Sequence, residues 1–248
     1  MKTNIAEFFD ESSLLHSEKT AVISQYEKDR TVTFGHLKDM SDDYACEFRR
    51  MGIAKGTKVL MMLRPGVDFI AAVFAVFKLG AVPVLIDPGM GLKNLLNCIR
   101  KTSPEAMIGI SKAHWLKYFF PFFFRTIRIS VAHGKFGPPW ITKLASMLGK
   151  NNRVKVFKCE KTNLDDTAAI VFTTGSTGPP KGVVYTHGIY IAQLDIIRKT
   201  YGAGSSEIDL PAFPLFALFS TAVGMTVVIP EMDPSRPANV NPEKIIEA

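Results

Sequence analysis

The stretch Ile170–Val184, IVFTTGSTGPPKGVV, decides how the rest of this 248-residue chain is interpreted. A β-branched run ends abruptly in hydroxyls and glycines, two prolines and one lysine follow, and a second β-branched pair closes the stretch. Glycines let a backbone approach an anion closely, while hydroxyls, free N–H groups and a lysine donate to its oxygens. The stretch therefore predicts a strand that leads into a phosphate-binding loop.

This loop is not a P-loop. The P-loop pattern places Ser or Thr directly after its lysine to bind a metal ion, whereas Gly182 follows Lys181 here. An ordinary surface turn is the alternative, because Gly, Ser, Thr and Pro are also common there. Donors dominate the stretch and it contains no general base, so the role we expect is to position a phosphate chain and stabilise its charge.

The stretch closely resembles the signature loop of the adenylate-forming enzymes, the superfamily of acyl-CoA synthetases, peptide-synthetase adenylation domains and luciferases. These enzymes use ATP to turn a carboxylate into an acyl adenylate and release pyrophosphate. The resemblance implies ATP as cosubstrate and Mg²⁺ as its usual companion. It also implies that the ATP phosphates are held by Thr173, Thr174, Gly175, Ser176, Thr177, Gly178 and Lys181.

Two earlier stretches are similar to scaffold motifs of the same superfamily. Gly52–Val59, GIAKGTKV, matches the lead into its first core strand, with Thr57 where aspartate is usual. Lys78–Pro88, KLGAVPVLIDP, matches its second core motif. Both support the fold, and neither adds a catalytic residue.

The segment Phe213–Phe219, FPLFALF, resembles one branch of the superfamily more than the others. Acyl-CoA synthetases usually carry histidine after Pro-Leu-Phe, near the carboxylate that is activated, and Ala217 stands there instead. Together with Thr173–His187, this segment resembles the β-lactone synthetases of long-chain olefin biosynthesis. The resemblance implies a long-chain 2-alkyl-3-hydroxy acid as substrate, no need for coenzyme A, and a substrate pocket near Phe216 and Ala217. A long-chain fatty acyl-CoA ligase is the alternative within the enzymes.

The resemblance covers the chain but only the N-terminal half of such an enzyme. Asn241–Ala248 has an N-cap candidate, a proline at the first helical position and an acid in the first turn, so the chain ends as a helix begins. The later family motifs, including the catalytic lysine of the C-terminal portion, are absent. We therefore expect a fragment with little activity of its own, no catalytic residue and no identifiable metal ligand. Among proteins that are not enzymes, the alternative is a module that binds a nucleotide or phosphate without catalysis.

Composition is typical of a globular protein, with 47% hydrophobic residues. The cysteines Cys46, Cys98 and Cys159 have no CxxC spacing, which predicts neither a disulfide framework nor a zinc site and fits a cytoplasmic location. Leu210–Pro230 contains no charged residue, yet its prolines, glycine and hydroxyls favour buried strand, turn and strand over a membrane span.

Positive charge is concentrated between residues 112 and 161. That segment holds eleven of the basic residues and the single acid Glu160, within a chain of net charge +7. No nucleic-acid recognition motif accompanies it, so we expect no nucleic-acid partner. A solvated face, an acidic partner and a peripheral contact with an anionic membrane remain as interpretations. Within the segment, Leu116–Arg125 is strongly aromatic, which is typical of either an interfacial anchor or core packing.

Strand and helix patterns alternate along the chain with short Gly/Pro connections, which predicts an α/β fold with doubly wound parallel sheets and helices on both faces. The chain is divided into a first α/β subdomain, residues 1–163, and the phosphate loop with the start of a second, residues 164–248. Thr33 and Thr186 are candidate N-caps, and His187 at the start of a helix is expected to pack rather than to catalyse. The expected strands are Thr20–Ser24, Arg30–Thr33, Val59–Leu63, Ala81–Ile86, Ala106–Ile110, Ile127–Val131, Lys155–Lys158 and Ala168–Phe172, and the expected helices are Asn4–Leu15, Phe34–Met51, Val67–Leu79, Leu92–Lys101, Ala113–Phe119 and His187–Tyr201.

Overall fold

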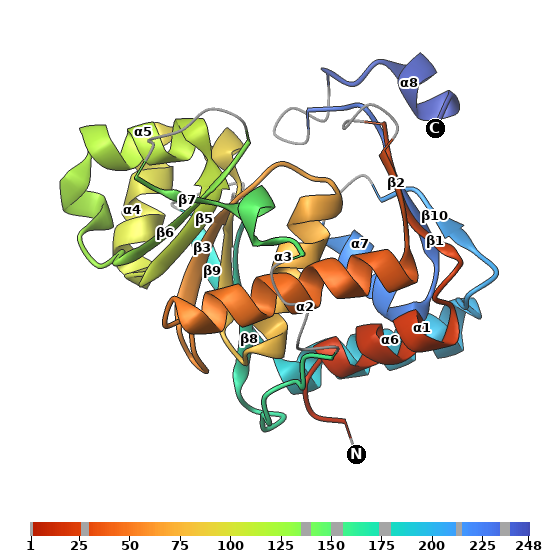
Figure 1. Ribbon diagram of the computed structural model, residues 1–248. Coiled ribbons are helices and arrows are strands. Elements are labelled where there is room, and N and C mark those ends of the chain that lie inside the picture. The colour runs from red at the N-terminus through yellow and green to blue at the C-terminus, as the bar shows by residue number, and fades with distance from the viewer. Residues whose placement is uncertain are drawn as a thin grey trace.

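A computed structural model describes residues 2–25, 30–134, 140–149, 156–173, 180–211, 215–233 and 239–248 of the chain. Its strands form two sheets, which lie apart in Figure 1 with the long helix α2 (Phe34–Arg50) running across in front of them. The α/β architecture expected from the alternating pattern is confirmed.

The larger sheet has seven strands in the order β7-β6-β5-β3-β4-β8-β9. Every neighbouring pair is parallel except the last, β8 with β9, which forms an antiparallel edge. Parallel strands of this kind are covered on both faces, so their sequences are nearly continuous runs of apolar residues. Their bounds are β3 (Lys58–Met62), β4 (Val82–Ile86), β5 (Ala106–Ile110), β6 (Ile129–His133), β7 (Thr142–Lys143), β8 (Thr167–Thr173) and β9 (Lys181–Thr186).

The smaller sheet joins the two ends of the chain. Its order is β10-β11-β1-β2, and β1 (Thr20–Ser24) pairs in parallel with β11 (Thr226–Ile229). The expected hairpin is confirmed, because β1 pairs antiparallel with β2 (Arg30–Thr33); β10 (Ile208–Asp209) forms the other edge. Each sheet thus takes strands from both sides of residue 163, and the division of the chain there stays a prediction.

The helices pack between and around the sheets. In α3 (Val67–Lys78) nearly every residue is buried, so this helix forms the centre of the main core. Phe9 of α1 (Ala6–Leu15) stacks on Phe74 of α3 with the ring centroids 4.0 Å apart. The further helices of the described residues are α4 (Leu92–Thr102), α5 (Ser111–Phe119), α6 (His187–Tyr201), α7 (Phe216–Val223) and α8 (Pro242–Ile246), with the short 3₁₀ turns η2 (Pro88–Met90), η3 (Pro121–Phe124) and η4 (Leu144–Met147).

The two predicted threonine caps are confirmed. Thr33 accepts a hydrogen bond from the backbone N–H of His36 at the start of α2, and Thr186 accepts one from Ile189 at the start of α6, each at 3.2 Å. These hydroxyls satisfy N–H groups that a helix leaves without an internal partner.

Two secondary-structure predictions were wrong. Within the uncharged stretch 210–230, the described residues from 215 onward form helix α7 followed by β11, not strand, turn and strand. All residues from Ala217 to Val223 are buried, so the stretch lacks the polar face that would have revealed a helical period. In the strand expected at Lys155–Lys158, the described residues 156–158 are irregular. No helix of the described segments is long and apolar enough to cross a membrane.

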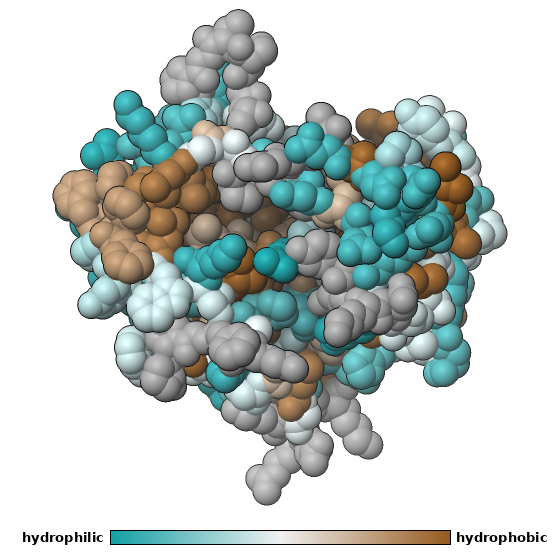
Figure 2. Space-filling model, turned by 90° about the horizontal axis from the view of Figure 1, so that it is seen from above, coloured by the Kyte–Doolittle hydropathy of each residue, from teal (hydrophilic) through white to brown (hydrophobic). Residues whose placement is uncertain are grey.

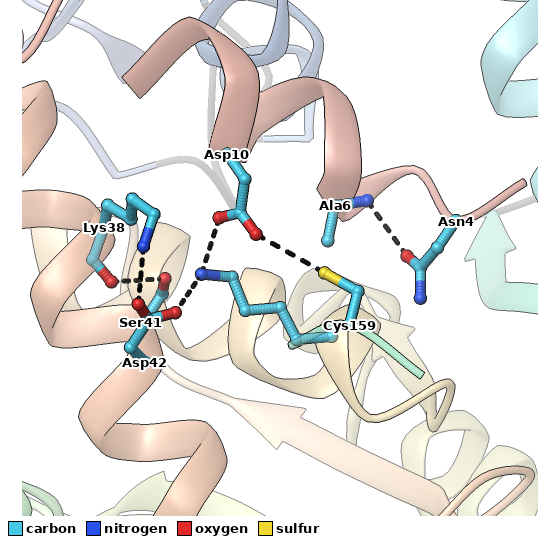
Figure 3. A network of polar contacts seen from close by, with 8 residues as sticks. Asn4, Ala6, Asp10, Lys38, Ser41, Asp42 and Cys159 are labelled. Atoms are coloured by element: carbon cyan, nitrogen blue, oxygen red, sulfur yellow. Dashed lines mark hydrogen bonds and ion pairs between the residues drawn. The ribbon is translucent and has the colours of Figure 1, made fainter. Parts of the chain in front are cut away.

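A buried charge network ties α1, α2 and α3 together (Figure 3). The Lys78 side chain is fully buried, and its ammonium contacts Oδ1 of Asp10 at 2.7 Å and Oδ1 of Asp42. Lys38 contacts the other oxygen of Asp42 at 2.6 Å, and the Cys159 thiol donates to Asp10 at 3.4 Å. Burial alone would lower the pKa of Lys78, but the two carboxylates outweigh burial and raise it. The ammonium is therefore charged in the core.

Candidate functional site

The base of the predicted phosphate loop is the end of the β8–β9 hairpin at which β8 ends and β9 begins. Thr173, the last residue of β8, is paired directly with Lys181, the first residue of β9, and both side chains are exposed. The structure thus brings the first and last predicted phosphate ligands together. Thr174, Gly175, Ser176, Thr177 and Gly178 lie outside the described residues, and their part in phosphate binding stays a prediction.

A close contact at the next pair supports the hairpin. Gly182 is opposite Phe172, and a Cβ built on Gly182 would lie 2.9 Å from Cζ of the Phe172 ring. Phe172 is 4% exposed and belongs to the apolar cluster beneath α4 and η3, so its ring has little room to move. Glycine after the lysine is therefore needed for packing, which explains why no Ser or Thr stands at this position.

The hairpin end lies at the carboxyl edge of the large sheet, where ligands bind in open α/β sheets. The register Ile86↔Phe172 brings Asp87, just after β4, level with Thr173. Thr173 is thus flanked by Asp87 on one side and Lys181 on the other. The Asp87 carboxylate accepts the backbone N–H of Gly89 at 2.7 Å and so orders the turn that follows β4.

His187 packs in the core beside the hairpin, as expected. Its ring is fully buried, its Nδ1 accepts the backbone N–H of Ile5 at 3.3 Å, and its ring lies edge-on to Phe77. Burial lowers the pKa of His187 from 6.5 to about 4. The imidazole is therefore neutral at physiological pH and links α6 to the start of the chain.

This burial makes folding stability depend on pH. Since the pKa of His187 is about 4 when folded and 6.5 when unfolded, the unfolded chain binds the extra proton between these values. The contribution of His187 to the free energy of unfolding is fully present above pH 6.5. It falls by about 3 kcal/mol as the pH decreases toward 4. His187→Asn keeps an acceptor for Ile5 but cannot titrate. We expect urea unfolding at pH 4 to 7 to show a steeper loss of stability for wild type than for this variant; parallel curves would contradict the assignment.

A carboxylate that the sequence did not single out links the two sheets. Asp68, in the first turn of α3, accepts from Tyr44 at 2.7 Å and contacts Arg30 of β2 at 2.9 Å and His133 of β6 at 3.1 Å. Burial alone would raise the pKa of Asp68, but hydrogen bonds from His133 and Tyr44 and the charge of Arg30 outweigh it and lower the pKa to about 2. In the sequence, Asp68 was recognisable only as an acidic residue at the start of a helix. Its three partners lie far away in the chain, so no local pattern indicated them.

The two residues predicted to line a substrate pocket have different surroundings. Phe216 begins α7 and is 56% exposed, whereas Ala217 is 1% exposed and belongs to the main core. The segment 212–214 just before them lies outside the described residues. Of this pair, Phe216 presents a surface that a ligand can contact, and the pocket itself stays a prediction.

Comparison with known proteins places this fold and this hairpin in one family. The family described as "AMP-binding enzyme" matches residues 9–245. The match covers nearly the whole chain, and the protein belongs to this family.

Within it, the chain is similar to two bacterial enzymes named olefin β-lactone synthetase. It is 37% identical over 220 residues to the protein of Xanthomonas campestris pv. campestris, covering 89% of this chain and 39% of that one. It is 38% identical over 220 residues to the protein of Stenotrophomonas maltophilia, covering 89% and 40%. The chain thus spans about two fifths of the length of these relatives.

Solved structures share the fold at lower identity. A long-chain-fatty-acid-CoA ligase of Archaeoglobus fulgidus superposes with a TM-score of 0.81 at 22% identity, covering 98% of this chain and 49% of that one. An anthranilate CoA ligase in complex with anthranoyl-AMP gives 0.79 at 17% identity, covering 92% and 46%. The fold expected from the loop motif, part of the large N-terminal domain of an adenylate-forming enzyme, is confirmed.

Proposed function

We propose that the whole enzyme uses ATP to convert a long-chain 2-alkyl-3-hydroxy acid into an acyl adenylate and then closes a β-lactone. The observation that carries this proposal is the 37% and 38% identity to two olefin β-lactone synthetases across 220 residues. The pairing of Thr173 with Lys181 at the carboxyl edge of the sheet supports the ATP-binding part.

The first step follows from the poor reactivity of a carboxylate, whose charge repels nucleophiles. In the proposal, a carboxylate oxygen attacks the α-phosphorus of ATP, the bond to the bridging oxygen breaks, and pyrophosphate leaves with its electron pair. Lys181 and Thr173 donate to the β- and γ-phosphates, together with the loop residues 174–178. Their role is to align the triphosphate and stabilise the departing charge, which needs no proton transfer by the protein.

The second step needs no external nucleophile. The substrate's own 3-hydroxyl oxygen attacks the activated carbonyl carbon, the bond to AMP breaks, and the hydroxyl proton passes to solvent or to a base outside the described residues. A four-membered lactone ring results. Because nucleophile and electrophile belong to one molecule, coenzyme A is not required.

Magnesium would accompany the ATP and shield the negative charge of its phosphates. No three His, Cys, Asp or Glu side chains within the described ranges are grouped to hold a metal ion. Mg²⁺ bound to a nucleotide takes many of its ligands from phosphates and water, so the site fits a magnesium–ATP substrate without a dedicated protein cage.

We assign the alkyl side of the substrate to the surface that begins at Phe216. Its exposed ring stands at the start of α7, and the next position carries alanine in place of the histidine that acyl-CoA synthetases usually have there. A long-chain substrate also partitions into lipid, so the proposal includes a peripheral contact of the enzyme with a membrane through residues 112–161.

Product analysis tests this function. The whole enzyme is incubated with ATP, Mg²⁺ and a long-chain 2-alkyl-3-hydroxy acid, with and without coenzyme A, and the products are identified by mass spectrometry. We expect the β-lactone and AMP in equal amounts in both reactions. A thioester formed only with coenzyme A would show an acyl-CoA ligase instead. Nucleotide binding with no AMP formed would show a non-catalytic module.

A further inference from the structure

An exposed aromatic cluster stands on the outer side of the large-sheet lobe. Trp115, Tyr118 and Phe119 of α5 are 49%, 69% and 68% exposed, and Phe122 of η3 is 56% exposed. The three α5 rings contact one another, with centroids 5.6 to 6.4 Å apart. We call these four residues the aromatic patch. Figure 2 shows hydrophobic residues gathered on the left of the molecule, over the lobe that carries α4 and α5 in Figure 1.

The opposite side of α5 is fixed to the sheet, which holds the aromatic patch outward. The buried His114 donates its Nε2–H to the carbonyls of Gly109 and Val131 at 3.2 and 3.1 Å. Lys117 donates to the Ser130 hydroxyl at 2.9 Å. Residues three or four apart share a helix face, so Trp115, Tyr118 and Phe119 point away from these anchors together.

Core packing accounts for only part of the aromatic stretch. Phe124 is 2% exposed and lies in the apolar cluster with Leu95 and Ile99 of α4. The four patch residues are exposed instead, although burying aromatic rings is strongly favourable. An exposed group of this kind marks a surface that is covered by something apolar when the protein works.

Positive charge surrounds the aromatic patch. Lys112 lies one turn before Trp115 on α5, and the Arg125 guanidinium lies over the Phe122 ring, 5.6 Å from its centroid. Both residues are exposed, as is Arg128 after η3. The single acid of the sequence between residues 112 and 161 is Glu160, which pairs with Arg49 of α2. The patch thus combines apolar rings with exposed positive charge.

We propose that the aromatic patch docks the protein on a lipid bilayer that carries anionic headgroups. Trp and Tyr favour the boundary between headgroups and acyl chains, Phe enters the acyl region, and Lys112, Arg125 and Arg128 contact lipid phosphates. A protein partner with acidic side chains would match the charges, but three rings of one short helix and a fourth beside them form a shallow insertion surface and not a groove. This inference deepens the membrane contact included in the proposed function.

Vesicle co-sedimentation of the whole protein tests the docking. We expect binding to phosphatidylcholine vesicles that contain 30% phosphatidylglycerol, weaker binding at high salt, and little binding to phosphatidylcholine alone. Lys112→Gln/Arg125→Gln should lower the partition coefficient roughly 30-fold, since each of the two cations near an anionic surface contributes a factor of about five. The matched control Arg50→Gln/Lys199→Gln removes the same charge from exposed positions outside residues 112–161 and should bind like wild type.

The aromatic part has its own variant and control. Tyr118→Ser/Phe119→Ser/Phe122→Ser should lower binding by more than about tenfold, because three rings no longer enter the bilayer. Leu14→Ser/Leu15→Ser changes two exposed apolar residues of α1 and should leave binding unchanged. The residues changed are exposed, so circular dichroism should show the wild-type fold. If the ring variant fails to fold, the comparison of Lys112→Gln/Arg125→Gln with its control still tests the proposal.

Tryptophan fluorescence reports on the patch through Trp115. The difference between the spectra of wild type and Trp115→Phe isolates this indole, and that difference spectrum should shift to shorter wavelength with anionic vesicles. No shift, equal binding to neutral and anionic vesicles, or equal loss in patch and control variants would overturn the proposal. So would a change of oligomeric state in the ring variant without a change in vesicle binding. None of these results depends on β-lactone formation, so failure here and failure of the proposed function are distinguishable.

Discussion

Lys181→Gln is expected to lower kcat/KM for ATP roughly 10- to 150-fold in pyrophosphate exchange by the whole enzyme, the equivalent of about 1.5–3 kcal/mol for one charge-assisted contact. Lys181 is the first residue of β9 and is directly paired with Thr173, the last residue of β8. An ammonium there neutralises a triphosphate more strongly than a neutral amide can. The loss should lie mainly in KM for ATP if the contact already exists in the ground state, and in kcat if it forms as pyrophosphate departs.

The control for this variant is Lys199→Gln, which removes one exposed lysine from α6. It should leave kcat/KM unchanged. Because Lys181 is exposed as well, both variants should unfold at the wild-type temperature, which separates binding from folding. If Lys181→Gln keeps activity within twofold of wild type, the lysine does not hold the phosphates.

Lys78→Met is expected to cause the largest loss of stability, about 3–5 kcal/mol, because it leaves the partly buried Asp10 without its cation and the buried Asp42 with one cation in place of two. Asp10 loses its ion pair, and Asp42 keeps only Lys38. Methionine has a similar unbranched shape, so the loss of charge rather than of volume dominates. For a domain of this size the melting temperature should fall by roughly 6–20 °C, measured by calorimetry or circular dichroism.

Lys199→Met is the matched control, since it makes the same chemical change at an exposed position. Its effect should stay within about 0.5 kcal/mol. Should Lys78→Met melt within about 2 °C of wild type, the network of Figure 3 would not stabilise the packing of α1, α2 and α3.

Local patterns predicted much of the fold. The alternation of apolar strands and amphipathic helices from residue 58 to residue 133 matches β3 to β6 within a few residues at each end. The caps of α2 and α6 were predicted because a threonine hydroxyl needs only the first helical turn to act. These features depend on neighbours in the sequence, which is why one sequence was enough.

Pairings between distant segments could not be predicted in the same way. β1 lies beside β11 across some two hundred residues, and no local pattern encodes that register. Helix α7 was missed for a related reason, since a segment buried on every side has no hydrophobic period. Its helical form follows from what surrounds it.

The candidate site was likewise predictable only where its residues are neighbours in the sequence. Thr173 and Lys181 were predicted together from a contiguous motif, and the hairpin register places them side by side. Asp68 was missed because its meaning depends on Arg30, Tyr44 and His133, which only the fold assembles. The aromatic stretch on α5 and η3 left two interpretations open, and the exposure of its rings favours a docking surface over core.

The most direct test of the central claim, that this hairpin holds ATP while a carboxylate is adenylated, is acid-dependent exchange of labelled pyrophosphate into ATP by the whole enzyme. We expect exchange with a long-chain 2-alkyl-3-hydroxy acid, background exchange without an acid, and a marked loss in Lys181→Gln. Exchange that proceeds equally without acid, or no exchange with the acid although it is turned over with ATP, would contradict it.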